Sequence, residues 1–108
     1  MPTTYKVLGQ SNPSATTETT LYTAASAAII STISVCNQAA TAATFRIVVR
    51  PAADATTTAK HYIVYGATVA ASDTTMITVG ITLATSDLVR VYASSANLSF
   101  NAFGSEIS

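Results

Sequence analysis

Charge is the scarcest property of this 108-residue chain. Lys and Arg together number five, as do Asp and Glu, so 9% of the residues are charged and the formal net charge is zero. A typical soluble domain has about 25% charged residues. A nucleic-acid-binding protein needs a basic patch that neutralises phosphates, and this composition does not supply one. The balance therefore argues against nucleic acid as a partner and against long-range capture of a charged ligand.

Cysteine and histidine are almost as scarce. The single Cys36 excludes an internal disulfide, and one Cys with one His cannot form a structural zinc site. Cys36 lies in an apolar stretch, where we expect a buried, inert thiol. His61 is the only imidazole that a hydrolytic triad could use, and we expect it at the polar edge of a strand and not as a general base.

Other catalytic constellations also lack their residues. Asp54, Asp73 and Asp87 fall in predicted turns, where an Asp side chain bonds to nearby backbone. A glycosidase needs two carboxylates held close together, and turn residues do not indicate such a pair. The four glycines are scattered and cannot form a phosphate-binding loop. The acids also lack the spacing of an oxygen-type metal site. We therefore predict a protein that is not an enzyme and that uses no metal or cofactor.

Long apolar runs are missing too. Polar residues interrupt every apolar stretch within about 10 positions, which is too short to cross a bilayer. The segment from Met1 to Lys6 has neither the basic nor the apolar region of a secretion signal, so we expect synthesis in a cytoplasm and no membrane partner. Lys and Glu are too few to cover helix surfaces, whereas the abundant Thr and Val favour strands.

The densest apolar pattern runs from Ala27 to Arg50. Two sets of apolar residues recur there at the period of two that is typical of a half-buried strand. Because only the segment from Asn37 to Thr41 separates them, we predict that they form the central hairpin of the core. The sets are Ile29, Ile33 and Val35, followed by Phe45, Ile47 and Val49.

Further strand patterns alternate with turn signals about every 8–12 residues, which is typical of antiparallel sandwiches and barrels. A brief helix is plausible only at Ala24–Ala28. We predict an all-β fold: a single antiparallel β-sandwich or jelly-roll-like barrel of seven to eight short strands over residues 1–108, in which residues 1–19 could form a partly extended N-terminal arm. The further strands are expected at Tyr5–Gln10, Leu21–Thr23, Lys60–Tyr65 (ending at Gly66), Met76–Leu83 (with a bulge or bend at Gly80), Leu88–Ala93 and Leu98–Phe103, with 104–108 as a tail.

Three arginines lie within predicted strands among apolar neighbours. They could belong to a solvated outer sheet face, with their stems covering apolar surface. Alternatively, the face that carries them is an interface, because Arg and aromatic residues are both enriched at protein interfaces. The interface candidates are Arg46, Arg50, Arg90, Tyr62 and Phe103, with Tyr65 and Tyr92 as further aromatic members.

Several blocks of the chain are familiar when taken together and in order. They are YKVLGQ at 5–10, ISVCN at 33–37, TFRIVVRP at 44–51, KHYI at 60–63, GITL at 80–83, VYAS at 91–94 and LSFNAFGSEI at 98–107. Over nearly its whole length the chain thereby resembles small virion structural proteins of tailed bacteriophages, including phages of cyanobacteria.

The resemblance implies a capsid cement (decoration) protein, which is a small β-domain that clamps neighbouring major capsid proteins at the capsid surface. It implies the major capsid protein as partner, a homo-oligomer with a trimer favoured, and no catalytic residues. A nearly neutral surface suits a part that works within an assembly. Two alternatives stay open. One is a tail, neck or baseplate component; the other is a carbohydrate-binding or adhesion module, which would need exposed aromatics and converging polar loops.

Overall fold

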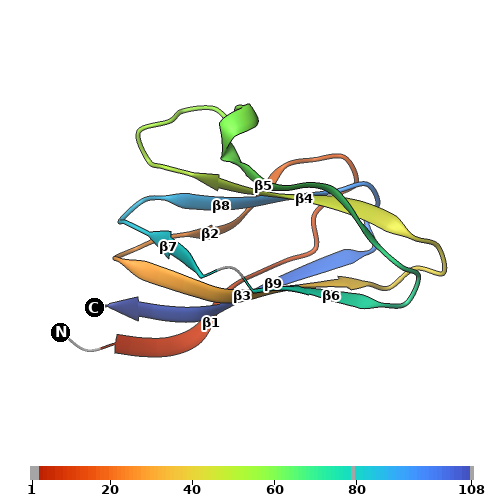
Figure 1. Cartoon of the computed structure of the whole chain (residues 1–108), viewed down its shortest axis with the longest axis horizontal. Coiled ribbons are helices and arrows are strands. Elements are labelled where there is room, and N and C mark those ends of the chain that lie inside the picture. The colour runs from red at the N-terminus through yellow and green to blue at the C-terminus, as the bar shows by residue number, and fades with distance from the viewer. Residues whose placement is uncertain (1–2, 79, 108) are drawn as a thin grey trace.

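Two antiparallel sheets stacked face to face make up the computed structural model, which describes residues 3–78 and 80–107 (Figure 1). The strands are β1 (Thr3–Ser11), β2 (Thr19–Thr23), β3 (Ala28–Asn37), β4 (Ala43–Arg50), β5 (Tyr62–Val69), β6 (Thr74–Ile77), β7 (Ile81–Leu83), β8 (Leu88–Ala93) and β9 (Leu98–Ile107). The five-stranded sheet has the order β1–β9–β3–β6, with β7 also paired to β3, and the four-stranded sheet has the order β2–β8–β4–β5. A short 3-10 turn, η1 (Ala59–His61), precedes β5.

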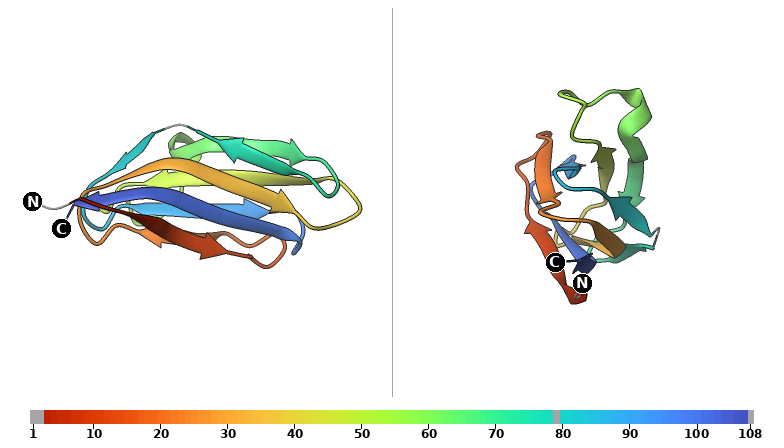
Figure 2. Two further views of the ribbon diagram at one scale, coloured as in Figure 1. Left: turned by 90° about the horizontal axis from the view of Figure 1, so that it is seen from below. Right: turned by 90° about the vertical axis from the view of Figure 1, so that its left-hand side faces the viewer.

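The chain changes sheet at most of its connections, and the end-on view shows the two layers (Figure 2). With β6 and β7 counted as one interrupted strand, the order is that of a jelly roll. The predicted all-β sandwich is therefore confirmed, with nine strands in place of seven or eight. The expected strand at Met76–Leu83 is split, since Gly80 has a φ of 60° between the two pieces. Val79, which the expected strand includes, lies outside the described residues.

The predicted central hairpin is wrong. Both strands form, but β3 pairs with β9, β6 and β7, whereas β4 pairs with β8 and β5. The connection after β3 instead carries the chain from one sheet to the other, so the apolar faces meet across the core. The rings of Phe45 on β4 and Phe100 on β9 pack edge to face there, with centroids 6.1 Å apart. A period of two identifies a buried face but cannot tell stacking from side-by-side pairing.

A β-bulge reverses the predicted face at the start of β3. Ile29 is 47% exposed, whereas Ile30 and Ile33 are fully buried. The register with β9 shifts between Ile30 and Thr32, which leaves Ser31 as an extra residue. Positions before and after an extra residue change sides, so Ile29 does not share a face with Ile33 as the sequence pattern predicted.

Four smaller expectations are also wrong. Ala24–Ala28 forms bends that lead into β3 and no helix. Gly66 does not end β5 but lies within it, with a φ of 75° beside a register shift against β4. Gly104 does not begin a tail, because β9 continues to Ile107; a Cβ at Gly104 would collide with the Ile29 carbonyl oxygen, so this glycine allows β3 and β9 to approach closely. Cys36 is half-buried on the outer side of β3, not enclosed in the core.

The start of the chain belongs to the sandwich. Residues 3–11 form β1, which pairs with β9. The following loop is attached to the turn before β9, because Asn12 Nδ2 donates hydrogen bonds to the carbonyl oxygens of Ala96 (2.9 Å) and Leu98 (2.7 Å). The amide of Thr16 donates to the Ala93 carbonyl oxygen at 2.8 Å. In the structure, the described part of residues 1–19 is thus a strand and a tied loop and not a separate arm.

Candidate functional site

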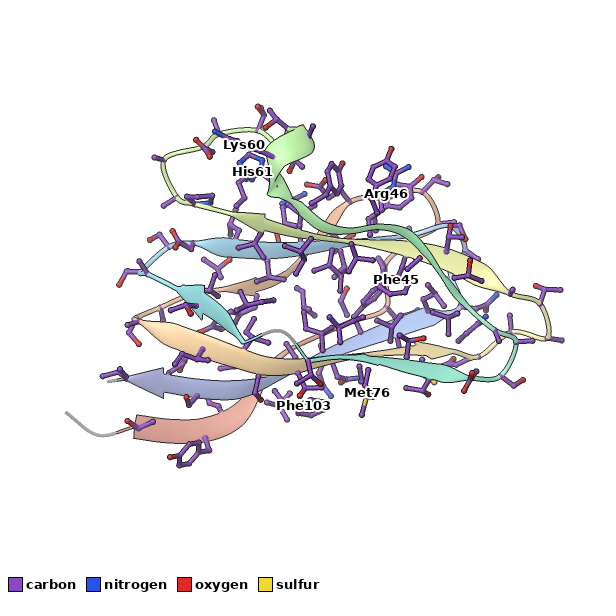
Figure 3. The ribbon with its side chains drawn as sticks, in the orientation of Figure 1. Phe45, Arg46, Lys60, His61, Met76 and Phe103 are labelled. Atoms are coloured by element: carbon purple, nitrogen blue, oxygen red, sulfur yellow. The ribbon has the colours of Figure 1, made fainter. Side chains whose placement is uncertain are left out.

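Four of the five interface candidates gather on the outer face of the four-stranded sheet. Arg46 and Arg50 lie on β4 and Arg90 on β8, on the side of the sheet opposite the core, and Tyr62 begins β5 beside them. Phe103 lies instead on β9, in the other sheet. Figure 3 shows Arg46 and Phe103 on opposite sides of the molecule, with Phe45 between the sheets. The sequence candidates therefore belong to two separate faces.

Arg46 is held between two tyrosine rings. Its guanidinium carbon lies 4.3 Å from the ring centroid of Tyr65 and 4.2 Å from that of Tyr92. The strand register causes this, since Arg46 pairs with Tyr65 on β5 and with Tyr92 on β8. Tyr62 extends the row, because its ring packs edge to face on that of Tyr65, with ring centroids 4.9 Å apart. Within the described residues Arg46 makes no ion pair with a carboxylate. Its charge is instead stabilised by the two tyrosine rings.

The other two arginines fasten loops to this sheet. Arg90 Nε donates to Glu18 Oε2 at 2.5 Å, and the Thr57 hydroxyl donates to the same oxygen at 2.7 Å. Arg50 Nη1 in turn donates to the Thr57 hydroxyl at 2.9 Å. Glu18 thus joins the loop before β2, the loop after β4 and β8. Glu18 was not among the predicted site residues, because an isolated acidic residue in a polar loop has no periodic pattern that indicates a role.

His61 closes the loop between β4 and β5, which covers part of the same face. Its side chain is buried, with Nε2 2.8 Å from Asp54 Oδ2, and the Thr58 amide donates to Nδ1 at 2.9 Å. Since Nδ1 accepts a hydrogen bond, the ring proton is on Nε2, which donates a hydrogen bond to the Asp54 carboxylate. This hydrogen bond is the main cause that lowers the pKa of the Asp54 carboxyl, and the Lys60 charge adds to it.

The expectation of a polar strand-edge histidine is therefore wrong. The 3-10 turn η1 begins after Thr58 and directs the ring of His61 under the loop, so the residue closes a loop instead of starting a strand. Both ring nitrogens are engaged by the loop itself. In this arrangement His61 holds the loop through both ring nitrogens.

A shallow open hollow lies beside the aromatic row, between the 51–61 loop and β5. It is lined by Thr57, Thr58, Ala59, Tyr62 and Tyr65. Tyr65 is 65% exposed, so an aromatic surface and a hydroxyl-bearing loop meet at this place. The hollow could accept a small polar group of a partner, with the tyrosine rings as its apolar wall.

A second polar cluster ties β1, β2 and β9 together. Lys6 Nζ lies 2.7 Å from Glu106 Oε1, and the Tyr22 hydroxyl donates a hydrogen bond to Glu106. Burial raises the pKa of the Tyr22 phenol and the neighbouring carboxylate raises it further, while the hydrogen bond from Lys6 lowers the pKa of Glu106. These contacts make the cluster a structural link between the three strands.

The described ranges contain no group of three His, Cys, Asp or Glu that could hold a metal ion. In residues 3–78 and 80–107 there is also no helix with the length and apolar character of a membrane span. A scan against family models and searches of curated proteins and of solved structures found nothing that matches this chain.

Proposed function

We propose that this chain is a structural virion protein, namely a capsid cement (decoration) protein that binds the major capsid protein lattice and stabilises a phage head. The observation that carries this proposal is the row of Arg46, Tyr65, Tyr92 and Tyr62 on the outer face of the four-stranded sheet. Tyr and Arg are the residues that most often dominate binding energy at protein interfaces.

The row is preorganised for binding. Arg46 is already fixed by two rings, which reduces the conformational entropy that binding would cost. The loops around the row are held to the sheet through Glu18 and through the contact between His61 and Asp54. A fixed, partly exposed guanidinium without a carboxylate partner suits an acidic or carbonyl-rich surface on a neighbouring protein.

The fold and the resemblance support the same proposal. Jelly rolls recur in viral capsid proteins and in lectins, although a fold alone does not assign a function. The resemblance to small virion proteins of tailed phages favours the first of these. A part that binds only the assembled lattice stabilises that state by mass action, and many copies sum modest contacts over a shell.

The copy number of this chain in a purified phage particle tests the proposal. Quantitative mass spectrometry against the major capsid protein should give a ratio near one to one, as expected for a protein that covers the head. A few copies per particle would instead assign it to the tail, neck or baseplate. Absence from the particle would reject a virion role altogether.

Replacement of Arg46 tests the face that we assign to the lattice. Arg46→Ala should weaken binding to capsids that lack this protein by about 30-fold or more, as for a residue at the centre of an interface. Thermal unfolding should change little, since an exposed cation–π contact contributes about 0.5–1 kcal/mol. Arg46→Lys is the matched control: it keeps the charge but loses the planar stack between the rings. Unchanged binding of Arg46→Ala at every salt concentration would contradict the assignment.

A carbohydrate-binding or adhesion module is the second candidate, because exposed Tyr65 and half-buried Tyr62 adjoin the threonines of the hollow. This candidate predicts that soluble sugars bind the free chain and that Tyr65→Ala abolishes the binding. The cement proposal predicts no competition by sugars for capsid binding. Titration of the chain with a glycan panel separates the two functions.

A further inference from the structure

Exposed apolar side chains concentrate on the five-stranded sheet. Among the described residues, eight large apolar side chains are exposed, and six of them belong to β1, β3, β6 and β9. They are Tyr5, Val7, Ile29, Met76, Phe103 and Ile107, whereas only Ile63 and Tyr65 lie on the four-stranded sheet. Figure 3 shows Phe103 and Met76 projecting away from the core residue Phe45.

The strand register brings these residues onto one surface. Tyr5 and Ile29 both pair with Ser105, on either side of β9, and Val7 pairs with Phe103. Paired residues of neighbouring strands share a face, and Phe103 alternates with buried Ala102. The side chains therefore lie together on the outer face that the left view of Figure 2 looks onto. A hollow between them is lined by Tyr5, Ile29 and Phe103 with the neighbouring Lys6, Ser31, Gly104 and Ser105.

Ionised side chains avoid this face. The outward positions of the described parts of β1, β9, β3, β6 and β7 carry Thr, Ser, Asn, Gln, Cys and apolar residues only. Lys6 borders the hollow, but it alternates to the other side of β1 and pairs with Glu106. By contrast, the opposite face carries four charged side chains, which are Glu18, Arg46, Arg50 and Arg90. A surface without charge can meet its own copy without like-charge repulsion.

The face is large enough for a specific contact. It spans four strand positions: β3 and β9 are ten residues long, β1 is nine, and β6 and β7 have four and three. With strands about 4.8 Å apart and a rise of about 3.4 Å per residue, the face covers roughly 600 Å² in projection. Two such faces would together bury about 1,200 Å², at the lower end of the range of about 1,200–2,000 Å² of specific protein interfaces.

We propose that two copies of this chain pack together through the outer faces of their five-stranded sheets, around a twofold axis. The contact places Phe103, Val7, Ile29 and Met76 of each copy against the same residues of the other, as in an isologous interface. It leaves the aromatic row around Arg46 free on the outer side of each copy. The proposal concerns the isolated chain and does not depend on a role in a virion.

Sedimentation velocity of the full chain over about a hundredfold concentration range tests the proposal. The wild type should shift from monomer to dimer as its concentration rises. Met76→Asp and Phe103→Asp should each raise the dimer dissociation constant at least about 100-fold, because every substitution places a charge on both sides of the interface. Met76 is 62% exposed, so its replacement does not put folding at risk.

Ile63→Asp is the matched control, because it adds the same charge at a 45% exposed apolar residue of the other sheet. It should leave the dissociation constant unchanged, and circular dichroism should show all three variants folded. A chain that stays monomeric at the highest concentration would overturn the proposal. So would a trimer, or a dimer that Met76→Asp and Phe103→Asp leave intact.

Discussion

Ile29 and Ile33 are the same residue type on the same strand, yet the bulge at Ser31 gives them opposite environments. Ile33 is fully buried and Ile29 is 47% exposed. Ile33→Ala should therefore lower the free energy of unfolding by about 2–5 kcal/mol, through lost burial and a core cavity. Ile29→Ala should change it by less than about 0.5 kcal/mol, as at most surface sites. Urea unfolding at a concentration at which the chain is monomeric measures both.

Equal losses for the two variants would contradict the bulged register. This pair also shows where sequence patterns stop being informative. Alternation predicted the inward side of Ile33 and Phe45 correctly, because β3 has no extra residue after Ile33 and the extra residues beside Phe45 belong to β5, not to β4. It failed for Ile29, because one extra residue reverses a period of two and Ser31 itself carries no signal that marks a bulge.

At the scale of elements, some turns and strand ends were predictable, whereas strand partners were not. Pro51 ends β4 and Asp87 holds a turn, with its carboxylate accepting from the Ala52 and Ala84 amides at 3.0 and 2.9 Å. Both effects are local and depend on a residue's own chemistry. The pairing of β3 with β9 joins residues more than sixty positions apart, and alternation contains no information about which strand lies beside which.

The loop between β4 and β5 should respond to acid through Asp54. The hydrogen bond from His61, helped by the charges of Lys60 and Arg50, lowers the pKa of this carboxyl from its ordinary value near 3.8. Ionised Asp54 therefore stabilises the fold above that ordinary value, and the stabilisation is lost as the pH falls through the lower pKa of the folded chain. Asp54→Asn should reduce the melting temperature at neutral pH and flatten its decrease on acidification.

Thermal unfolding followed from neutral pH to about pH 2 measures this dependence. Asp73→Asn is the control, because it removes the same charge from an exposed turn where Asp73 Oδ1 accepts from the Thr74 amide and is not within ion-pair distance of a cation in the described residues. The control should keep the wild-type pH profile. Parallel profiles for the wild type and Asp54→Asn would mean that the contact with His61 contributes nothing to stability.

At the scale of the whole molecule, the two outer faces differ in kind. One carries the arginines, their acid partner and the tyrosine row; the other exposes apolar and uncharged polar groups. Composition alone predicted a protein that works in an assembly, since 9% charged residues is low for a free monomer. It could not predict that the charges segregate, because register and bulges decide the side to which each residue belongs. The divided surface suits a protein that meets two different neighbours.

The position of the N-terminal segment distinguishes a packed domain from a core with a detachable arm. β1 covers one edge of β9, and Lys6 pairs with Glu106 across that edge. Deletion of residues 1–11 would expose the backbone edge of β9 and leave Glu106 and Tyr22 without Lys6. We therefore expect the truncated chain to lose cooperative unfolding and to aggregate. Circular dichroism and light scattering during thermal unfolding measure both properties.

Tyr5→Thr controls for the loss of exposed apolar surface, since Tyr5 is 83% exposed and its replacement keeps the backbone pairing of β1. This variant should unfold like the wild type at low protein concentration. If the truncated chain also unfolded like the wild type, residues 1–11 would be an arm that the domain does not need. Such an arm would be free to reach a neighbouring subunit, and the lattice contact would then have to be sought there as well as around Arg46.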